Sequence, residues 1–284
     1  MTRRLGVHTS IAGGLHLSLE KAYALGCNTL QIFSHSPRGW AVKEISHQDV
    51  SLFKSLRVKL DISPVYVHSS YLINIASENE LLKKKSIAML TTEMDRADEI
   101  GADYVVLHTG SASSDDKRSS MKRAISALNE IAQMKNWKAG LLIENTAGER
   151  GDISSTIPEM SEILRSVKNS FVSGICLDTC HAFAAGYDIR TGSGIRRIAG
   201  EIEQYIGFEK VRLIHLNDSK GTNGSRVDRH EHIGSGQIGE ECLGRFISYK
   251  QLRDVPLILE TPKKKESDDP VNLAKVRRML GMKQ

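Results

Sequence analysis

Six short apolar runs in this chain each end in a histidine, an aspartate or a glutamate. These run-ending residues are His68, His108, Glu144, Asp178, His215 and Glu260. Neighbouring members of the series lie 34 to 45 residues apart, about the length of one strand followed by one helix. Imidazole and carboxylate groups together suit zinc, manganese or iron, whereas calcium and magnesium favour shells of oxygen ligands. The spacing therefore predicts that six potential transition-metal ligands converge.

Three further residues of ligand type lie close to this series. His181 follows Asp178 by three residues, where a buried strand gives way to a helix. Asp228 and His230 stand two residues apart in the loop after His215, where an extended backbone would place both side chains on the same side. With His181 they could complete a separate tripod. The alternative for the Asp178 segment is a helix-capping aspartate followed by a surface histidine.

Nine ligands are more than one cation needs, so we predict a cluster of cations. A carboxylate can bridge two cations because each of its oxygens can bind one, and Glu144 lies between the earlier histidines and the later acidic residues. Cations held close together stabilise both oxygens of a displacement at phosphorus and lower the pKa of a bound water from about 15.7 toward about 7. The predicted chemistry is the hydrolysis of a phosphoester.

Length and composition limit the kind of protein that can carry these predicted ligands. A chain of 284 residues with 40% hydrophobic residues fits one domain, residues 1–284, of the size of an eight-unit barrel. The net charge of +5 is compatible with a polyanionic partner but does not decide it. The four cysteines form no Cys-x-x-Cys pair and are interpreted as reduced core residues. No apolar stretch reaches about 18 residues, so we expect a soluble, cytoplasmic protein with no membrane partner.

Strands and helices are expected to alternate along the whole chain. The expected strands cover residues 5–8, 29–33, 64–68, 104–108, 141–144, 172–177, 211–215 and 256–260. The expected helices cover residues 14–25, a segment opened by Ser46 and Asp49, 78–100, 119–135, a segment capped by Ser155, 195–206, 238–249 and 270–280. Eight such units predict an α/β protein with a single (β/α)8 TIM barrel, whose active site lies at the C-terminal mouth.

Long motifs surround the ligand residues. They are HSSYLIN at 68–74, LLIENTAG at 141–148, LDTCHAFAAGYD at 177–188, LNDSK at 216–220, GSRVDRH at 224–230 and LILETP at 257–262. These motifs resemble endonuclease IV, the zinc-dependent apurinic/apyrimidinic endonuclease family of base-excision repair. The resemblance runs from the first strand to the last. One departure is Thr109, where the family usually has proline after the histidine, and it affects loop stiffness more than ligation.

The resemblance implies a trinuclear zinc site, with manganese or iron able to fill part of it. One ion would be held by His68, His108 and Glu144. Glu144 would be shared with a second ion that also takes Asp178, His215 and Glu260. The third would be held by His181, Asp228 and His230. The resemblance also implies the catalytic residues Glu144, Glu260 and His108.

The same resemblance implies the substrate. This would be double-stranded DNA, cut on the 5′ side of an abasic site to leave a 3′-hydroxyl and a 5′-deoxyribose phosphate. Blocked 3′ ends would also be trimmed by phosphodiesterase or phosphatase activity. We expect a monomer.

Four residues are predicted to contact DNA, namely Arg38, Tyr71, Leu72 and Arg229. Apolar side chains in a loop beside the metals could act as a wedge between bases. Alternatively, Tyr71 and Leu72 fold back onto the helix at 78–100, and Arg38 forms a core-edge pair with Trp40. The run of lysines at 263–265 is interpreted as a solvated loop, with a phosphate contact as the alternative.

The remaining candidates by residue type are weaker. His16, His35 and His47 lie on expected helices or outer loops and are interpreted as surface histidines, whereas His8 and His232 are interpreted as groups beside the ligands. The glycines of residues 233–239 lack phosphate-loop spacing and indicate a flexible loop. Two rival functions are a sugar isomerase of similar barrel shape, which has no use for the pair at 228 and 230, and a catalytically idle DNA-binding or metal-storage protein.

Overall fold

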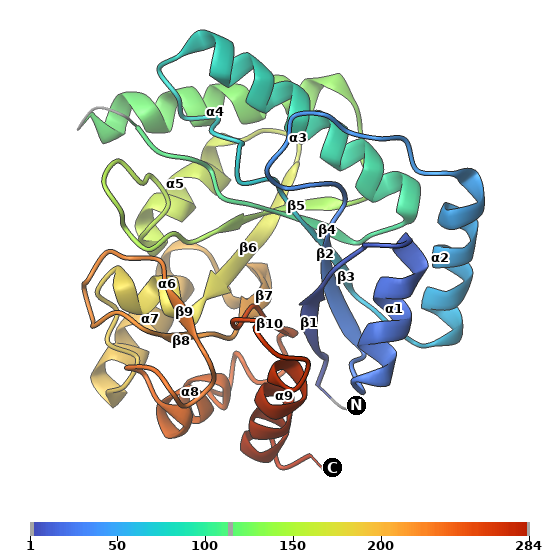
Figure 1. Cartoon of the computed structure of the whole chain (residues 1–284). Helices are drawn as coiled ribbons and strands as arrows, with labels where there is room; N and C mark the ends of the chain where they lie inside the picture. The colour runs from blue at the N-terminus through green and yellow to red at the C-terminus, as the bar shows by residue number, and fades with distance from the viewer. Residues whose placement is uncertain (1–2, 113–115, 283–284) are drawn as a thin grey trace.

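The strands of the chain close into a barrel, with the helices around its outside (Figure 1). The computed structural model describes residues 3–112 and 116–282. The eight barrel strands are all parallel to their neighbours and follow the order β1, β10, β7, β6, β5, β4, β3 and β2. Their bounds are β1 (Leu5–Thr9), β2 (Thr29–Phe33), β3 (Val65–His68), β4 (Tyr104–Leu107), β5 (Gly140–Glu144), β6 (Val172–Asp178), β7 (Val211–His215) and β10 (Leu257–Leu259). The predicted TIM barrel is confirmed, and each expected strand is found to within one residue at either end.

Helices follow the strands in the expected alternation. They are α1 (Leu15–Ala24), α2 (His47–Lys59), α3 (Glu80–Ile100), α4 (Lys117–Met134), α5 (Ile157–Ser166), α6 (Thr179–Ala184), α7 (Gly192–Tyr205), α8 (Glu240–Ile247) and α9 (Asp268–Met279), with a 3-10 turn at Phe208–Lys210. Ser46 caps α2 as expected, because its side chain accepts a hydrogen bond from the backbone N–H of Asp49.

The cap of α5 lies one residue later than the sequence suggested. The side chain of Thr156, not that of Ser155, accepts from the backbone N–H of Glu159, and the Glu159 carboxylate accepts in return from the Thr156 N–H. The Ser155 hydroxyl instead donates to Glu159. A serine followed by a threonine offers two capping hydroxyls, and the reciprocal capping box selects the one three residues before the glutamate.

Six side chains fill the inside of the barrel as one apolar layer. They are Tyr66, Val106, Leu142, Cys176, Leu213 and Ile258, all fully buried. Successive residues of a strand point to opposite faces, so residues two positions apart share a face. The residues two positions after these six are the six run-ending ligands. The alternation that packs the barrel interior therefore also points the predicted ligands inward, above that layer at the mouth.

A small antiparallel sheet that was not expected covers part of the mouth. Its strands are β8 (Asp218–Ser219) and β9 (His230–Glu231), and Ser219 pairs with His230. The buried Asp218 carboxylate accepts hydrogen bonds from the backbone N–H groups of the loop at 233–239, at positions 234, 236, 238 and 239. The interpretation of that loop as flexible is wrong, since it is wrapped around a buried charge that it satisfies.

Three of the four cysteines lie in the core, as expected. All four cysteines are free thiols, three of them buried and Cys242 partly so. Across the described ranges, no helix combines the length and the apolar character needed to span a membrane.

Candidate metal centre at the barrel mouth

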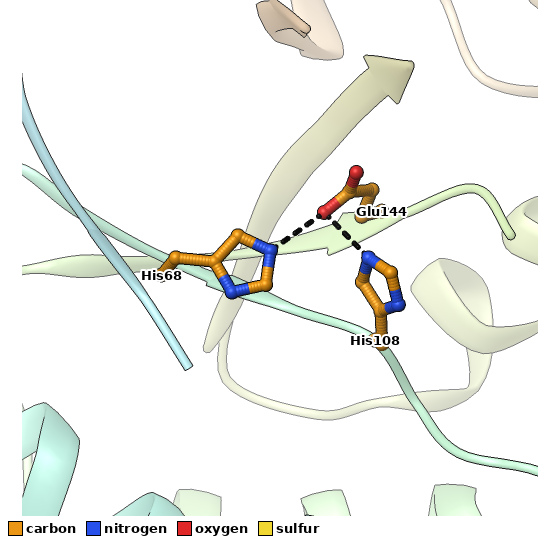
Figure 2. A group of neighbouring side chains, drawn as sticks. All are labelled: His68, His108 and Glu144. Atoms are coloured by element: carbon orange, nitrogen blue, oxygen red, sulfur yellow. Dashed lines mark hydrogen bonds and ion pairs between the residues drawn. The ribbon is translucent and has the colours of Figure 1, made fainter. Parts of the chain in front are cut away.

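The first predicted ligand trio converges on one carboxylate oxygen. The Nε2 atoms of His68 and His108 lie 3.2 and 2.9 Å from Oε2 of Glu144 (Figure 2). His68 ends β3, His108 follows β4 and Glu144 ends β5, three neighbouring strands of the barrel. Glu144 is fully buried and His68 nearly so. Two imidazoles and a carboxylate therefore face one another without intervening side chains, within the spacing that a shared cation needs.

The second predicted group lies around the other oxygen of Glu144. His215 Nδ1 is 2.8 Å from Glu144 Oε1, 3.2 Å from Glu260 Oε2 and 4.0 Å from Asp178 Oδ2. One ligand atom from each of these four residues lies within 4.8 Å of the others. Glu144 thus faces both groups, one with each oxygen, which is the arrangement of a bridging carboxylate.

The third predicted group joins His181 of α6 to Asp228 and His230 of the hairpin β8–β9. His181 Nε2 and His230 Nε2 are 3.4 Å apart, and Asp228 Oδ1 lies 3.2 Å from the first and 3.5 Å from the second. Asp178 Oδ2 also approaches His230 Nε2, at 3.6 Å. Asp178 therefore lies between the second and third groups, which the sequence did not predict.

Backbone carbonyls fix the orientation of three of the histidines. Nδ1 of His68 donates to the Ser69 carbonyl at 2.8 Å, and Nδ1 of His181 donates to the Asn145 carbonyl at 2.9 Å. His230 Nδ1 is 3.1 Å from the Glu260 carbonyl. A carbonyl only accepts, so Nδ1 carries a proton and Nε2 is the nitrogen that faces the centre, where it can bind a cation once it is deprotonated. This pattern is typical of metal-ligating histidines, and the donor set fits transition-metal ions.

Neighbouring charges shift the pKa values of a carboxylate and an imidazole of the centre in opposite directions. Burial alone would raise the pKa of Glu144, but the charges of His215 and His108 outweigh it and hold that pKa well below its usual value. Burial alone would lower the pKa of His181, yet Asp178 and Asp228 raise it well above its usual value. Glu144 is thus held ionised and ready to accept a cation, and cation binding has to displace a proton from His181.

A cavity of about 850 Å³ opens above the centre. Six of the nine predicted ligands line it, namely His68, His108, His181, Asp228, His230 and Glu260. Glu144, Asp178 and His215 lie deeper and have no exposed surface. The volume is within the range of ligand pockets, about 300–1,000 Å³, so a group entering from the mouth can meet the ligands from above.

The four predicted DNA contacts lie on loops around the mouth. Tyr71 is 63% exposed, and its ring packs edge-on against Phe33 at 5.2 Å between ring centroids. Its side chain also lines the cavity, so it has not folded back onto α3. Leu72 is half-buried, whereas Arg38 and Arg229 are exposed.

The remaining five histidines differ in whether they contact a predicted ligand, lie at the surface or are buried elsewhere. His8 Nδ1 lies 3.2 Å from Glu260 Oε1 and His232 Nδ1 lies 3.0 Å from the Asn272 side chain, so only His8 directly contacts a predicted ligand. His16 pairs with Asp49, and His47 is exposed. His35 is 8% exposed, so its interpretation as a surface histidine is wrong.

Sequence reasoning missed the amide side chains that hold the ligands. Gln31, from the middle of β2, donates from Nε2 to Glu260 Oε1 at 2.6 Å, and its Oε1 lies 2.8 Å from His215 Nε2. Asn217 donates to Asp178 Oδ2 at 2.7 Å, and Asn145 accepts from the Asp178 N–H. A signal was present, because Gln31 lies between Leu30 and Ile32 in a strand that is expected to be buried, and buried polar groups need partners.

The chain has relatives of known names. Residues 19–280 match the family described as xylose isomerase-like TIM barrel. A protein of Halothermothrix orenii named "Probable endonuclease 4" is 42% identical over 276 residues, which cover 97% of this chain and 99% of that protein. The structure of endonuclease IV from Thermus thermophilus has a TM-score of 0.86 at 36% identity and covers 98% of this chain and 99% of its own. A D-tagatose 3-epimerase-like protein has a TM-score of 0.72 at 21% identity, a likeness that shows the fold alone.

Proposed function

The chain belongs to the endonuclease 4 family, and on that premise we propose that it is a DNA-repair endonuclease that cuts duplex DNA on the 5′ side of an abasic site. The observation that carries the proposal is the convergence of all nine predicted ligand residues at one cavity, six in its lining and three beneath it. A phosphodiester is anionic, so it matches a centre built to hold several cations.

We assign the three groups to three cations, zinc in the main. His68 and His108 would share one with Glu144, and Glu144 would share the next with Asp178, His215 and Glu260. His181, Asp228 and His230 would hold the last. Such ions, when bound, supply Lewis acidity to the phosphate oxygens and a water of lowered pKa.

The side chains of the cavity position the phosphodiester. Glu260 and His108 line the cavity, so we assign them direct contact with the reacting group. Hydrogen bonds from Gln31 and His8 fix the Glu260 carboxylate from behind. Glu144 is fully buried and acts through the imidazoles that it holds in place.

The reaction adds one water across a phosphorus–oxygen bond. The oxygen of the water forms the new bond to phosphorus, and the bond from phosphorus to the 3′ oxygen of the preceding nucleotide breaks. The proton goes to that oxygen, so the products are a 3′-hydroxyl and a 5′-deoxyribose phosphate. Because the cavity is open at the mouth, we also propose trimming of blocked 3′ ends by the same chemistry.

The duplex would meet the loops of the mouth before it meets the cavity floor. Tyr71 and Leu72 are placed to enter the base stack where a base is missing, since an abasic site lowers the unstacking cost. Arg38 and Arg229 are exposed cations at the same rim, suited to phosphate contacts.

The test is a cleavage assay on a duplex with one tetrahydrofuran abasic analogue, which cannot undergo β-elimination. We expect zinc-loaded protein to give a single cut 5′ to the analogue, with a 3′-hydroxyl that a polymerase extends, and elemental analysis to find about three equivalents of metal. An intact duplex and a chelator-treated sample are the controls. Failure to cut the analogue, or one equivalent of metal or fewer after loading, would contradict the proposal.

A further inference from the structure

A buried carboxylate outside the metal centre joins two loops of the mouth. Glu93 belongs to the middle of α3 and is 1% exposed. Its Oε1 accepts a hydrogen bond from the backbone N–H of Ser70 at 2.9 Å and lies 2.7 Å from His35 Nε2. A carboxylate only accepts, so the imidazole is the donor. Ser70 belongs to the loop after β3, and His35 belongs to the loop after β2.

The two loops that Glu93 joins are those that carry three of the four proposed DNA contacts. His35 is three residues before Arg38, and Ser70 immediately precedes Tyr71 and Leu72. His35 and Tyr71 both line the cavity. A contact between α3 and these two residues therefore sets the position of one loop relative to the other.

A second hydrogen-bonded link runs directly between the loops. The Ser70 hydroxyl donates to the Pro37 carbonyl at 2.8 Å and accepts from the Leu72 N–H at 3.2 Å. Arg96, one turn after Glu93 on α3, donates to the Lys43 carbonyl at 2.8 Å. The helix thus supports the first loop near both of its ends and the second loop at its start.

The surroundings of Glu93 are unusual for a carboxylate with a purely structural role. Within the described part of the chain, Glu93 Oε2 and His35 Nδ1 are both buried and have no hydrogen-bond partner. An apolar residue at position 93 would avoid that desolvation, but it would leave the Ser70 and His35 donors unpaired. At this position one side-chain oxygen of Glu93 accepts from both loops.

We propose that Glu93 is a positioning residue for abasic-site recognition, which holds the Arg38 loop and the Tyr71–Leu72 loop at one fixed separation. This inference rests on the proposed function, since it concerns the same substrate. Both loops must contact a bent duplex at the same time. Loops that move relative to each other have to be ordered when DNA binds, and a preformed contact surface avoids that entropic cost. The role is in recognition, and it leaves the metal ligands and the chemical step unchanged.

The test compares Glu93→Ala with Glu93→Gln, and uses Glu99→Ala, at an exposed position of the same helix, as the matched control. Loss of two hydrogen bonds in Glu93→Ala should weaken binding to the abasic duplex by roughly tenfold. Binding to an intact duplex, kcat at saturating DNA and metal content should stay close to wild type. The amide oxygen of glutamine can still accept from both donors, so Glu93→Gln should restore most of the affinity.

A readout without DNA separates this inference from the proposed function. The chain has two tryptophans, so in a Trp137→Phe background Trp40 alone reports on the Arg38 loop, where it is 36% exposed. Acrylamide should quench Trp40 more strongly in Glu93→Ala than in Glu93→Gln or Glu99→Ala. This readout holds even if the wild-type protein were to prove indifferent to abasic sites.

Two outcomes would overturn the inference. One is a Glu93→Ala protein with wild-type quenching and a wild-type ratio of abasic to intact affinity. The other is a loss of metal or kcat with that ratio unchanged, which would assign Glu93 to the metal centre. If Glu93→Ala does not fold, His35→Ala removes one of the two donors and leaves the other, and the same readouts decide.

Discussion

The ligand layer and the rim loops of the barrel mouth are built in different ways. The deeper predicted ligands Glu144, Asp178 and His215 have no exposed surface, and backbone and amide groups orient the predicted ligand side chains. The rim residues Tyr71 and Arg38 stand in solvent on loops. Strand ends are positioned by the closed sheet, whereas loops are positioned by a few hydrogen bonds from outside it.

This difference separates chemistry from recognition within one mouth. A change in the ligand layer should remove metal and activity together, because each ligand serves more than one neighbour. A change in the rim should alter affinity for damaged DNA and leave metal content intact. The following variants test that division.

The largest effect is expected at the carboxylate that two ligand groups share. Glu144→Ala should lose metal and lower kcat/KM by well over 100-fold, since even partners of ligands contribute about 10–100-fold. Glu144→Gln should keep some metal but little turnover. Elemental analysis and the cleavage assay measure both, with the exposed Glu162→Ala as control. A normal rate in Glu144→Ala would remove the proposed bridge.

A smaller effect is expected at the amide that orients two ligands. Gln31 touches both Glu260 and His215, so Gln31→Ala should weaken zinc affinity by roughly 10–100-fold. A competition titration with a chromophoric chelator measures this, and Gln133→Ala, at an exposed position of α4, is the control. Unchanged zinc affinity would mean that the strand ends alone position the ligands.

Tyr71 and Leu72, the proposed wedge at the rim of the mouth, should affect only the affinity for DNA with an abasic site. Tyr71→Ala with Leu72→Ala should weaken binding to the abasic duplex by more than tenfold, a loss above about 1.4 kcal/mol. Metal content and fold should be unchanged, and binding to an intact duplex should change much less. Tyr23→Ala with Leu52→Ala removes exposed apolar groups from α1 and α2 and is the control. Equal losses on both duplexes would argue against a wedge.

The smallest effect is expected from single phosphate contacts. Arg38→Ala and Arg229→Ala should each reduce the slope of log affinity against log salt by about 0.9, on abasic and intact duplexes alike. Arg253→Ala, at an exposed position in the turn that precedes β10, should leave the slope unchanged. Affinity that does not depend on salt would point to a small-molecule substrate.

The sequence by itself determined the barrel and which residues of ligand type point into its mouth. Glu144 ends the apolar run that contains Leu142, two positions earlier, so a strand that points one of them into the barrel points the other inward as well. Helix starts were less certain where two capping residues adjoin, as at Ser155 and Thr156. Periodicity is a local property, and it can be read without knowing which strands are neighbours.

Only the tertiary structure decided which groups meet between strands and loops. Gln31 reaches Glu260 from 229 positions away in the sequence, and Asp178 approaches His230 because the hairpin β8–β9 crosses the mouth. The burial of His35 against Glu93 depends on α3 packing beside the loop after β2. Such contacts depend on barrel closure and loop geometry, which no local pattern encodes, and they determine how firmly the predicted ligands and DNA contacts are held.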